Sequence, residues 1–111
     1  MKEKSLIEKS KNFAVDIINM GEYIKGKSIL VNQIIKSATS IGANIREANY
    51  AQSKKDFISK LEIALKECYE TEYWLELLFD TNAVDEQSFK NAGSIRRMLI
   101  ASIKTAKTNS N

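Results

Sequence analysis

The chain contains no proline and no histidine, and it has only four glycines and one cysteine. Turn-rich β architectures need more glycine and proline than this, so the composition favours helices. Without histidine, the usual Ser-His-Asp and Cys-His nucleophilic systems cannot be built. A common zinc site is excluded too, as is a di-iron bundle, which needs Glu-x-x-His pairs. We therefore expect no enzymatic activity: no catalytic residues, no metal site, no cofactor and no small-molecule substrate.

The same sparseness bears on the compartment. The single Cys68 cannot form an intramolecular disulfide, which fits a reducing environment. No apolar run reaches the roughly 18 residues that a membrane-spanning helix needs. The first twelve residues, MKEKSLIEKSKN, are polar and include acids, unlike a secretory signal peptide. We therefore expect a cytoplasmic protein without a membrane partner.

What is present suits one small helical domain. The 111 residues are 43% hydrophobic and 28% charged, which is an ordinary globular balance, and we expect one domain over residues 1–111. Apolar residues alternate at steps of three and four in four segments, which predicts helices over about 5–24, 28–51, 54–81 and 86–107. The links between them are short, so neighbouring helices must run antiparallel. The predicted fold class is all-α, an up-down-up-down four-helix bundle.

Local signals mark some of the helix ends. Gly26 is a natural stop for the first helix, because glycine tolerates the left-handed conformation that follows a helix end. Ser53, with Asp56 three residues later, resembles a capping box at the start of the third helix. Asp85 is a good N-cap for the fourth. Gly42 lies inside the second helix, where glycine costs about 1 kcal/mol, so we expect it to have a packing reason.

The third helix carries more apolar surface than a bundle core requires. It has an unbroken seam of core positions, and apolar side chains also lie on both flanks of that seam. One interpretation is that this helix is simply the most central of the four. The other is that its surplus surface is buried against another subunit. We favour homo-oligomerisation, and the predicted interface residues are Ile63, Tyr73, Trp74 and Leu77.

Charge is distributed unevenly along the chain. Residues 54–80 hold four Lys/Arg and seven Asp/Glu, a net charge of −3, whereas residues 85–111 hold five and two, a net charge of +3. The third and fourth helices are thus complementary, and this charge could orient neighbours within the bundle or between subunits. Acids such as Glu67 and Glu70 on the third helix could in principle act as a general acid and base, but a solvated charged face is the favoured interpretation. Cys68 falls on the core seam, where a buried thiol is favoured over a nucleophile.

The overall net charge of +3 permits an RNA or DNA partner without requiring one. Lys54 and Lys55 lie in the first turn of a helix, where cations oppose the helix dipole, which favours a role beyond solubility. Tyr50 nearby could stack on a base or pack over the turn. The alternative for all these cations is scattered solubilising charge. The candidate nucleic-acid contacts are Arg46, Lys54, Lys55, Arg96, Arg97, Lys104 and Lys107.

One stretch of the chain is distinctive. Residues 37–78 read SATSIGANIREANYAQSKKDFISKLEIALKECYETEYWLELL. The SIGANI element (40–45), Glu47, SKKDF (53–57) and the run from Leu61 to Leu75 closely resemble the 23S ribosomal RNA intervening-sequence proteins. The family's recurring polar positions match Ser40, Asn44, Glu47, Ser53 and Lys54, which we interpret as helix-packing and capping residues.

This resemblance implies a four-helix bundle that assembles into a ring-shaped homopentamer, with no assigned enzymatic activity. Genes of this family can lie in intervening sequences of ribosomal RNA genes. A related branch, the accessory variability proteins of diversity-generating retroelements, forms basic pentamers that bind nucleic acid and a reverse transcriptase. The leading prediction is therefore a non-enzymatic, pentameric structural or scaffold protein. The alternative is an RNA- or DNA-binding accessory factor.

Overall fold

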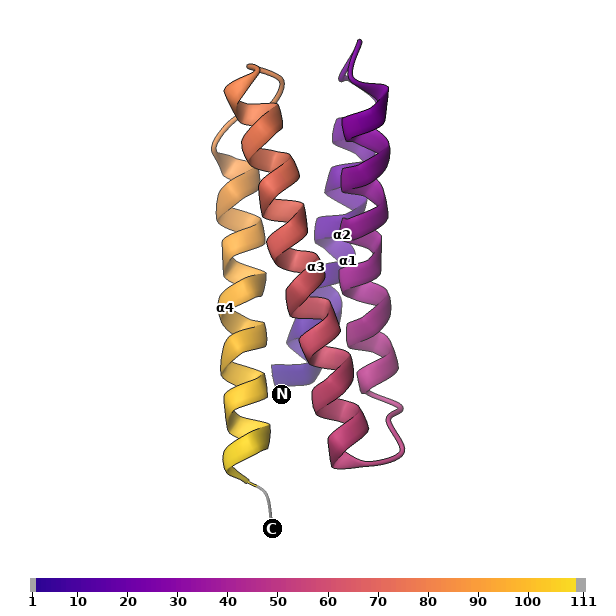
Figure 1. The fold of residues 1–111 in the computed structure, drawn as a ribbon, viewed down its shortest axis with the longest axis vertical. Coiled ribbons are helices and arrows are strands. Elements are labelled where there is room, and N and C mark those ends of the chain that lie inside the picture. Colours follow the sequence, from indigo (N-terminus) through magenta and orange to yellow (C-terminus); the bar gives the residue numbers. More distant parts are fainter. Residues whose placement is uncertain (1, 110–111) are drawn as a thin grey trace.

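A computed structural model describes residues 2–109, with side chains from Ser5 onward. Within that range the chain forms four α-helices: α1 (Lys2–Gly21), α2 (Ser28–Ala48), α3 (Lys54–Asp80) and α4 (Gln87–Thr108). Successive helices run in opposite directions (Figure 1). Each helix packs against two others in the cyclic order α1, α2, α3, α4, and the α2–α3 contact is the most extensive. The predicted all-α, up-down-up-down four-helix bundle is confirmed.

The core consists of the predicted seams. The bundle is a rod of 51 × 20 × 19 Å, and one line of apolar side chains from each helix meets along its axis. In α3 the buried residues follow alternating steps of three and four, as the sequence pattern predicts. These are Leu61, Ala64, Cys68, Thr71, Leu75 and Leu78.

Two helices end earlier than predicted, at Gly21 instead of residue 24 and at Ala48 instead of residue 51. After each end the backbone continues for three residues in tighter turns, with N–H groups bonding to the carbonyl three residues back. Ile24 still packs against the core from such a turn. The spacing of apolar residues therefore continues beyond the end of the α-helix, because a tighter turn also brings a side chain back to the core.

The predicted cap of α3 is present, whereas the residue before α4 is Glu86, whose side chain makes no capping hydrogen bond, and the predicted Asp85 lies one residue earlier. The Ser53 hydroxyl accepts the N–H of Asp56 at 3.0 Å, and the Asp85 carboxylate accepts the N–H of Gln87 at 3.1 Å. Gly26 has a φ of 78°, and it adopts this left-handed conformation in the connection before α2 rather than at the end of α1.

The glycines differ in how much space surrounds them. A Cβ on Gly42 would lie 3.6 Å from the Ser10 hydroxyl of α1, an ordinary contact distance. The expected packing reason for glycine at this position is therefore wrong. The tight approach occurs instead at Gly21, where a Cβ would lie 2.9 Å from Cγ1 of Val31. Gly21 thus lets the start of α2 close against the end of α1.

Candidate assembly and nucleic-acid surfaces

The outer surface of α3 carries exposed apolar and aromatic side chains. Ile63 is 40% exposed, and Tyr69 and Tyr73 are each 53% exposed. Phe79, near the end of the helix, is 38% exposed. All four project from a helix that already buries a complete seam on its inner side. Packing within the bundle therefore leaves part of the apolar surface of α3 exposed.

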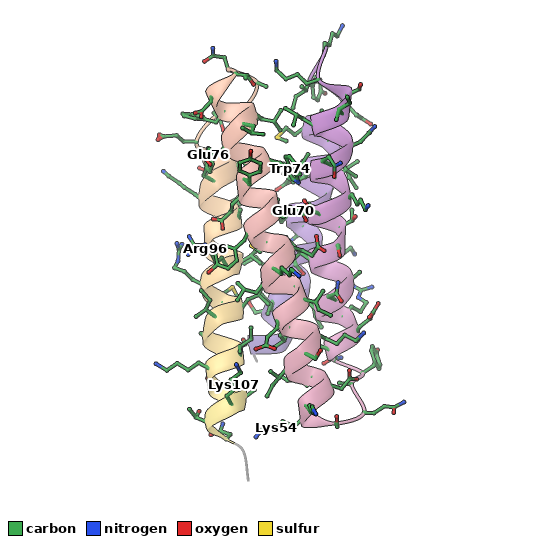
Figure 2. The ribbon with its side chains drawn as sticks, viewed as in Figure 1. Lys54, Glu70, Trp74, Glu76, Arg96 and Lys107 are labelled. Atoms are coloured by element: carbon green, nitrogen blue, oxygen red, sulfur yellow. The ribbon has the colours of Figure 1, made fainter. Side chains whose placement is uncertain are left out.

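The other two predicted interface residues, Trp74 and Leu77, are half-buried, and Trp74 packs against the core cluster. The rings of Tyr73 and Trp74 lie 5.2 Å apart and are tilted relative to each other. The indole nitrogen of Trp74 is buried and has no hydrogen-bond partner among the described residues. The structure thus places Tyr73 and Ile63 on the surface, whereas Trp74, labelled in Figure 2, is half-buried beside Tyr73.

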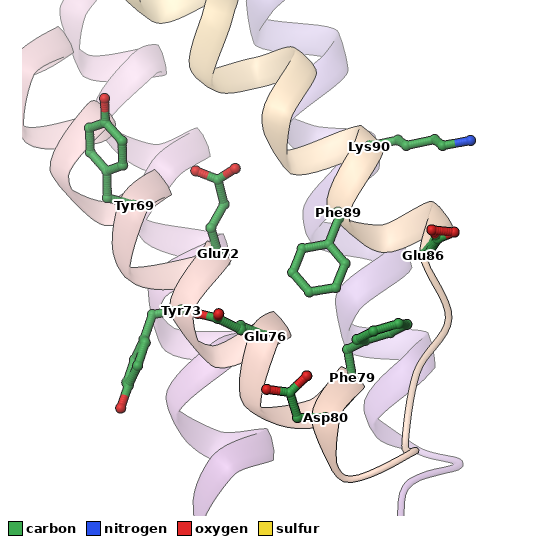
Figure 3. A pocket seen from close by; sticks show the side chains of 9 residues that line it. All are labelled: Tyr69, Glu72, Tyr73, Glu76, Phe79, Asp80, Glu86, Phe89 and Lys90. Atoms are coloured by element: carbon green, nitrogen blue, oxygen red, sulfur yellow. The ribbon is translucent and has the colours of Figure 1, made fainter.

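An open groove of about 660 Å³ runs between the end of α3 and the start of α4. Phe79 and Phe89 meet edge-to-face in it, with ring centroids 5.4 Å apart. Acids surround this aromatic pair, and Lys90 points away from them (Figure 3). The lining residues are Tyr69, Glu72, Tyr73, Glu76, Phe79, Asp80, Glu86, Phe89 and Lys90. This groove was not predicted from the sequence. Its walls come from two different helices, and the pattern within one helix does not show how it packs against another.

Two of the seven candidate nucleic-acid contacts are engaged within the bundle. The Arg96 Nε donates to both carboxylate oxygens of Glu72, at 2.9 and 3.2 Å. Lys107 pairs with Glu62 at 2.9 Å. Both pairs link α4 to α3, so the predicted complementarity of these helices is used inside the bundle.

The other five candidates are exposed and have no ion pair within residues 5–109. Arg46, Lys54 and Lys55 surround the α2–α3 connection, and Lys104 lies near the end of α4. Lys54 and Lys107 mark this shared end of the rod in Figure 2. Arg97 lies midway along α4, with its guanidinium beside Gly93. The structure therefore gathers most of the predicted contacts at one end but leaves Arg97 apart.

The rod is electrically polar. At the end where α2 meets α3, residues 5–11, 44–62 and 102–109 hold eight Lys/Arg and four Asp/Glu. At the opposite end, residues 16–34 and 73–91 hold three Lys/Arg and six Asp/Glu. Tyr50, 78% exposed, lies at the basic end between Arg46 and Lys54. A modest net charge thus conceals a basic end and an acidic end.

The titratable groups of the interior offer little chemistry. Burial raises the pKa of the Cys68 thiol to about 12, helped by nearby Glu72 and opposed by Arg96. The thiol lies 3.5 Å from the Ala92 carbonyl, to which it donates. A thiol with this pKa stays protonated at neutral pH and is a poor nucleophile. Within the part of the chain that the structure describes, no three potential metal ligands cluster.

Glu67 and Glu70 lie close together where α3 faces α2. Burial raises the pKa of Glu67, and the neighbouring Glu70 raises it further, through charge repulsion and a hydrogen bond. Lys36 of α2 acts in the opposite direction. The predicted solvated acidic face of α3 therefore includes carboxyls that are only partly solvated, Glu67 here and Glu72 beside Arg96.

The polar positions shared with the intervening-sequence proteins make structural contacts. The Asn44 side-chain amide donates to the Ser40 carbonyl at 2.9 Å and to its hydroxyl at 3.2 Å. Glu47 pairs with Lys60 at 3.1 Å, which ties α2 to α3 across their connection. The Ser53 cap and the Glu47–Lys60 pair agree with the predicted capping and packing roles, whereas the Asn44–Ser40 bonds lie within α2 and the exposed Lys54 has no ion pair within residues 5–109.

Comparison with known proteins decides the family. The sequence profile of the family described as 23S rRNA-intervening sequence protein matches residues 2–104. The chain belongs to this family. The crystal structure of a protein of unknown function of the S23 ribosomal protein family, from Bacteroides thetaiotaomicron VPI-5482, is similar with a TM-score of 0.88. The two sequences are 46% identical, and the match covers 94% of this chain and 99% of that one. No match was found among curated proteins.

The family assignment agrees with the four-helix bundle but does not name a chemical reaction. The solved relative is described as a protein of unknown function. No helix among the described residues combines the length and apolarity that crossing a membrane requires. The surfaces described above are therefore the features from which a function must be argued.

Proposed function

We propose that this intervening-sequence protein is a non-enzymatic structural or scaffold protein that works as a homo-oligomer, with a ring of five copies as the expected assembly. The observation that carries the proposal is the outer surface of α3, where Ile63, Tyr69 and Tyr73 remain 40–53% exposed beside a complete buried seam. Exposed apolar and aromatic side chains beyond those that fill a core are typical of protein–protein interfaces. The number five comes from the family resemblance.

The absence of enzymatic activity is proposed on chemical grounds. The chain has no histidine, and its one thiol is buried with a pKa of about 12. The groove between α3 and α4 is open and is lined mainly by acids and aromatic rings, without an activated nucleophile. Such a surface suits binding better than bond making.

Substitution of the exposed residues tests the assembly. Ile63→Asp and Tyr73→Asp each place a charge in the proposed contact, and each should lower the mass measured by light scattering towards that of one chain. Asn19→Asp, on an exposed position of α1, is the matched control and should leave the mass unchanged. An unchanged mass in both interface variants would mean that α3 is not the contact surface.

A second candidate function is supported by the basic end. Arg46, Lys54 and Lys55 are exposed there and have no ion pair within residues 5–109, and Tyr50 is 78% exposed among them. Cations that track phosphates and an exposed ring that stacks on bases together suit a single-stranded nucleic acid. Repetition of this end in a ring would multiply a modest patch of charge.

Fluorescence anisotropy with a labelled single-stranded RNA, and with the DNA of the same sequence, tests this candidate over a range of salt concentrations. Affinity should fall steeply with salt, because phosphate contacts release counterions. The double variant Lys54→Glu/Lys55→Glu should bind more weakly and with a shallower salt slope. Lys25→Glu, an exposed charge change at the opposite end, should bind as the wild type does. An affinity that changes neither with salt concentration nor in the double variant would rule this function out.

A further inference from the structure

The ion pairs inside the bundle leave part of the charge on α3 and α4 unused. Arg96 and Lys107 of α4 are engaged by Glu72 and Glu62 of α3. No ion pair within residues 5–109 involves Lys90, Arg97 and Lys104 of α4, or Glu76 and Asp80 of α3. All five are exposed. The complementarity of the two helices is thus only partly satisfied within one copy.

The unused cations form a line along α4, which we call the α4 basic stripe: Lys90, Arg97 and Lys104. They are spaced by seven residues, which is about two helical turns, so their side chains leave the helix on the same side. Ser94 and Ala101, which lie four residues after Lys90 and Arg97 respectively, are small. A neighbouring helix could therefore approach this stripe closely.

The unused acids lie among the exposed rings of α3. Tyr69, Tyr73, Glu76 and Asp80 follow one another at steps of four, three and four, and we call them the α3 acidic–aromatic face. All four are exposed. Figure 3 shows both tyrosine rings projecting away from the phenylalanine pair that joins α3 to α4. These rings are available to a partner.

The stripe and the face lie at matching heights along the rod. Contacts between the two helices pair Phe79 with Phe89, Glu72 with Arg96, and Glu62 with Lys107. By interpolation, Lys90 is level with Glu76 and Asp80, and Arg97 is level with Tyr69 and Tyr73. Within one copy Lys90 nevertheless points away from the acids (Figure 3). A second copy in the same orientation would bring an α4 basic stripe to the α3 face with these levels preserved.

We propose that the α4 basic stripe of one copy docks on the α3 acidic–aromatic face of the next, a partner assignment that rests on the proposed homo-oligomer. Lys90 then pairs with Glu76 and Asp80 of the neighbouring copy, and the Arg97 guanidinium packs on the rings of Tyr69 and Tyr73 as a cation–π contact. The contact is heterologous, since each copy offers a different surface on either side. Because α3 and α4 are adjacent corners of the bundle, each copy is turned relative to the last, which is the arrangement that a closed ring requires.

Charge reversal on either surface tests this contact. Lys90→Glu/Arg97→Glu disables the stripe, and Glu76→Lys/Asp80→Lys disables the face. Each variant alone should lose the assembly and run at the mass of one chain in light scattering, with unchanged helical circular dichroism because all four positions are exposed. Lys9→Glu/Lys11→Glu, an equal charge change on exposed positions of α1, is the control and should assemble normally.

Mixing the two disabled variants separates this contact from any other. One variant keeps an intact face and the other an intact stripe, and the reversed stripe of the first is complementary in charge to the reversed face of the second, so an equimolar mixture should form complexes larger than one chain. A mixture that stays monomeric would overturn the proposed contact. If the wild type assembles and both variants assemble equally well, the contact is wrong but the oligomer stands. If the wild type itself is a monomer, the proposed function fails first.

Discussion

Thr71 and Ser37 illustrate how single polar residues are accommodated in this core. Their hydroxyl oxygens lie 2.7 Å apart across the α2–α3 interface, and both side chains are buried. Thr71 also lies 2.8 Å from the Glu67 carbonyl, and Ser37 donates to the Ile34 carbonyl at 3.2 Å. The heptad pattern places Thr71 in the core, but only the structure reveals its partner. The pattern within one helix does not specify the axial position of α2 relative to α3.

A double-mutant cycle should detect this hydrogen bond. Thr71→Val and Ser37→Ala are each expected to destabilise the fold by about 1 kcal/mol, a typical value for an internal hydrogen bond. The double variant should cost clearly less than the sum, because the two groups then leave no partner unsatisfied. Urea unfolding at one fixed chain concentration measures all four proteins, and strict additivity would contradict the contact.

Glu67 gives a pH-dependent prediction at the same scale. Its pKa is raised in the folded state from a reference of 4.5, chiefly by burial. A carboxyl with a raised pKa contributes stability that is present below the unfolded pKa and is lost as the pH rises through the folded value. Glu67→Gln should therefore be more stable than the wild type at pH 7, and this advantage should shrink on approaching pH 4.5. Thermal unfolding over that range measures it, and an advantage independent of pH would refute the cause.

At the scale of the elements, the sequence predicts the helices well and their ends less well. The seams of all four helices follow from apolar spacing, since a period near 3.6 leaves one buried stripe per helix. The Ser53 cap and the hydrogen bond that Asp85 accepts follow from local chemistry. The ends of α1 and α2 do not, because a switch to tighter turns keeps the apolar period while ending the α-helix.

The start of α3 depends on its cap. Lys54 and Lys55 in the first turn oppose the helix dipole, so the Ser53 hydroxyl and the nearby Asp56 carry the stabilising interactions there. Ser53→Ala should lower the free energy of unfolding by about 1 kcal/mol. Ser59→Ala, exposed within the same helix, should be neutral or slightly stabilising. Equal effects from the two substitutions, measured by chemical denaturation, would show that the cap is unimportant.

Two glycines should respond oppositely to alanine. Gly42→Ala has room beside Ser10 and should stabilise α2 by about 0.5–1 kcal/mol, since alanine loses less backbone entropy on folding. Gly21→Ala must displace Val31, which lies 2.9 Å from the new methyl position, and should destabilise the bundle. The melting temperatures of the two variants check the pair. A loss of stability in Gly42→Ala would mean that α1 and α2 pack more tightly than the structure shows.

At the scale of the whole molecule, the candidate surfaces were only partly predictable. The sequence indicated that α3 and α4 are electrically complementary, but not that Arg96 and Lys107 are engaged internally while Lys90 and Arg97 are left over. It singled out Trp74, which proves to be half-buried, and did not include the exposed Tyr69 in the predicted interface. These differences depend on the rotation and height of one helix against another, which periodicity within a helix does not specify.

Two surfaces of the molecule suit two different kinds of contact. The outer sides of α3 and α4 offer aromatic and charged groups for contacts between copies, and the end near the α2–α3 connection gathers unpaired cations. In a ring of parallel copies the basic ends would all face the same way. Assembly through α3 and α4 would therefore leave the basic end free to bind another molecule.

The mass of the wild-type protein in solution tests the central claim most directly. Sedimentation equilibrium at micromolar chain concentration should give five times the chain mass of 12.6 kDa. A single species of 12.6 kDa at that concentration would contradict the account, because the exposed surface of α3 would then need another explanation.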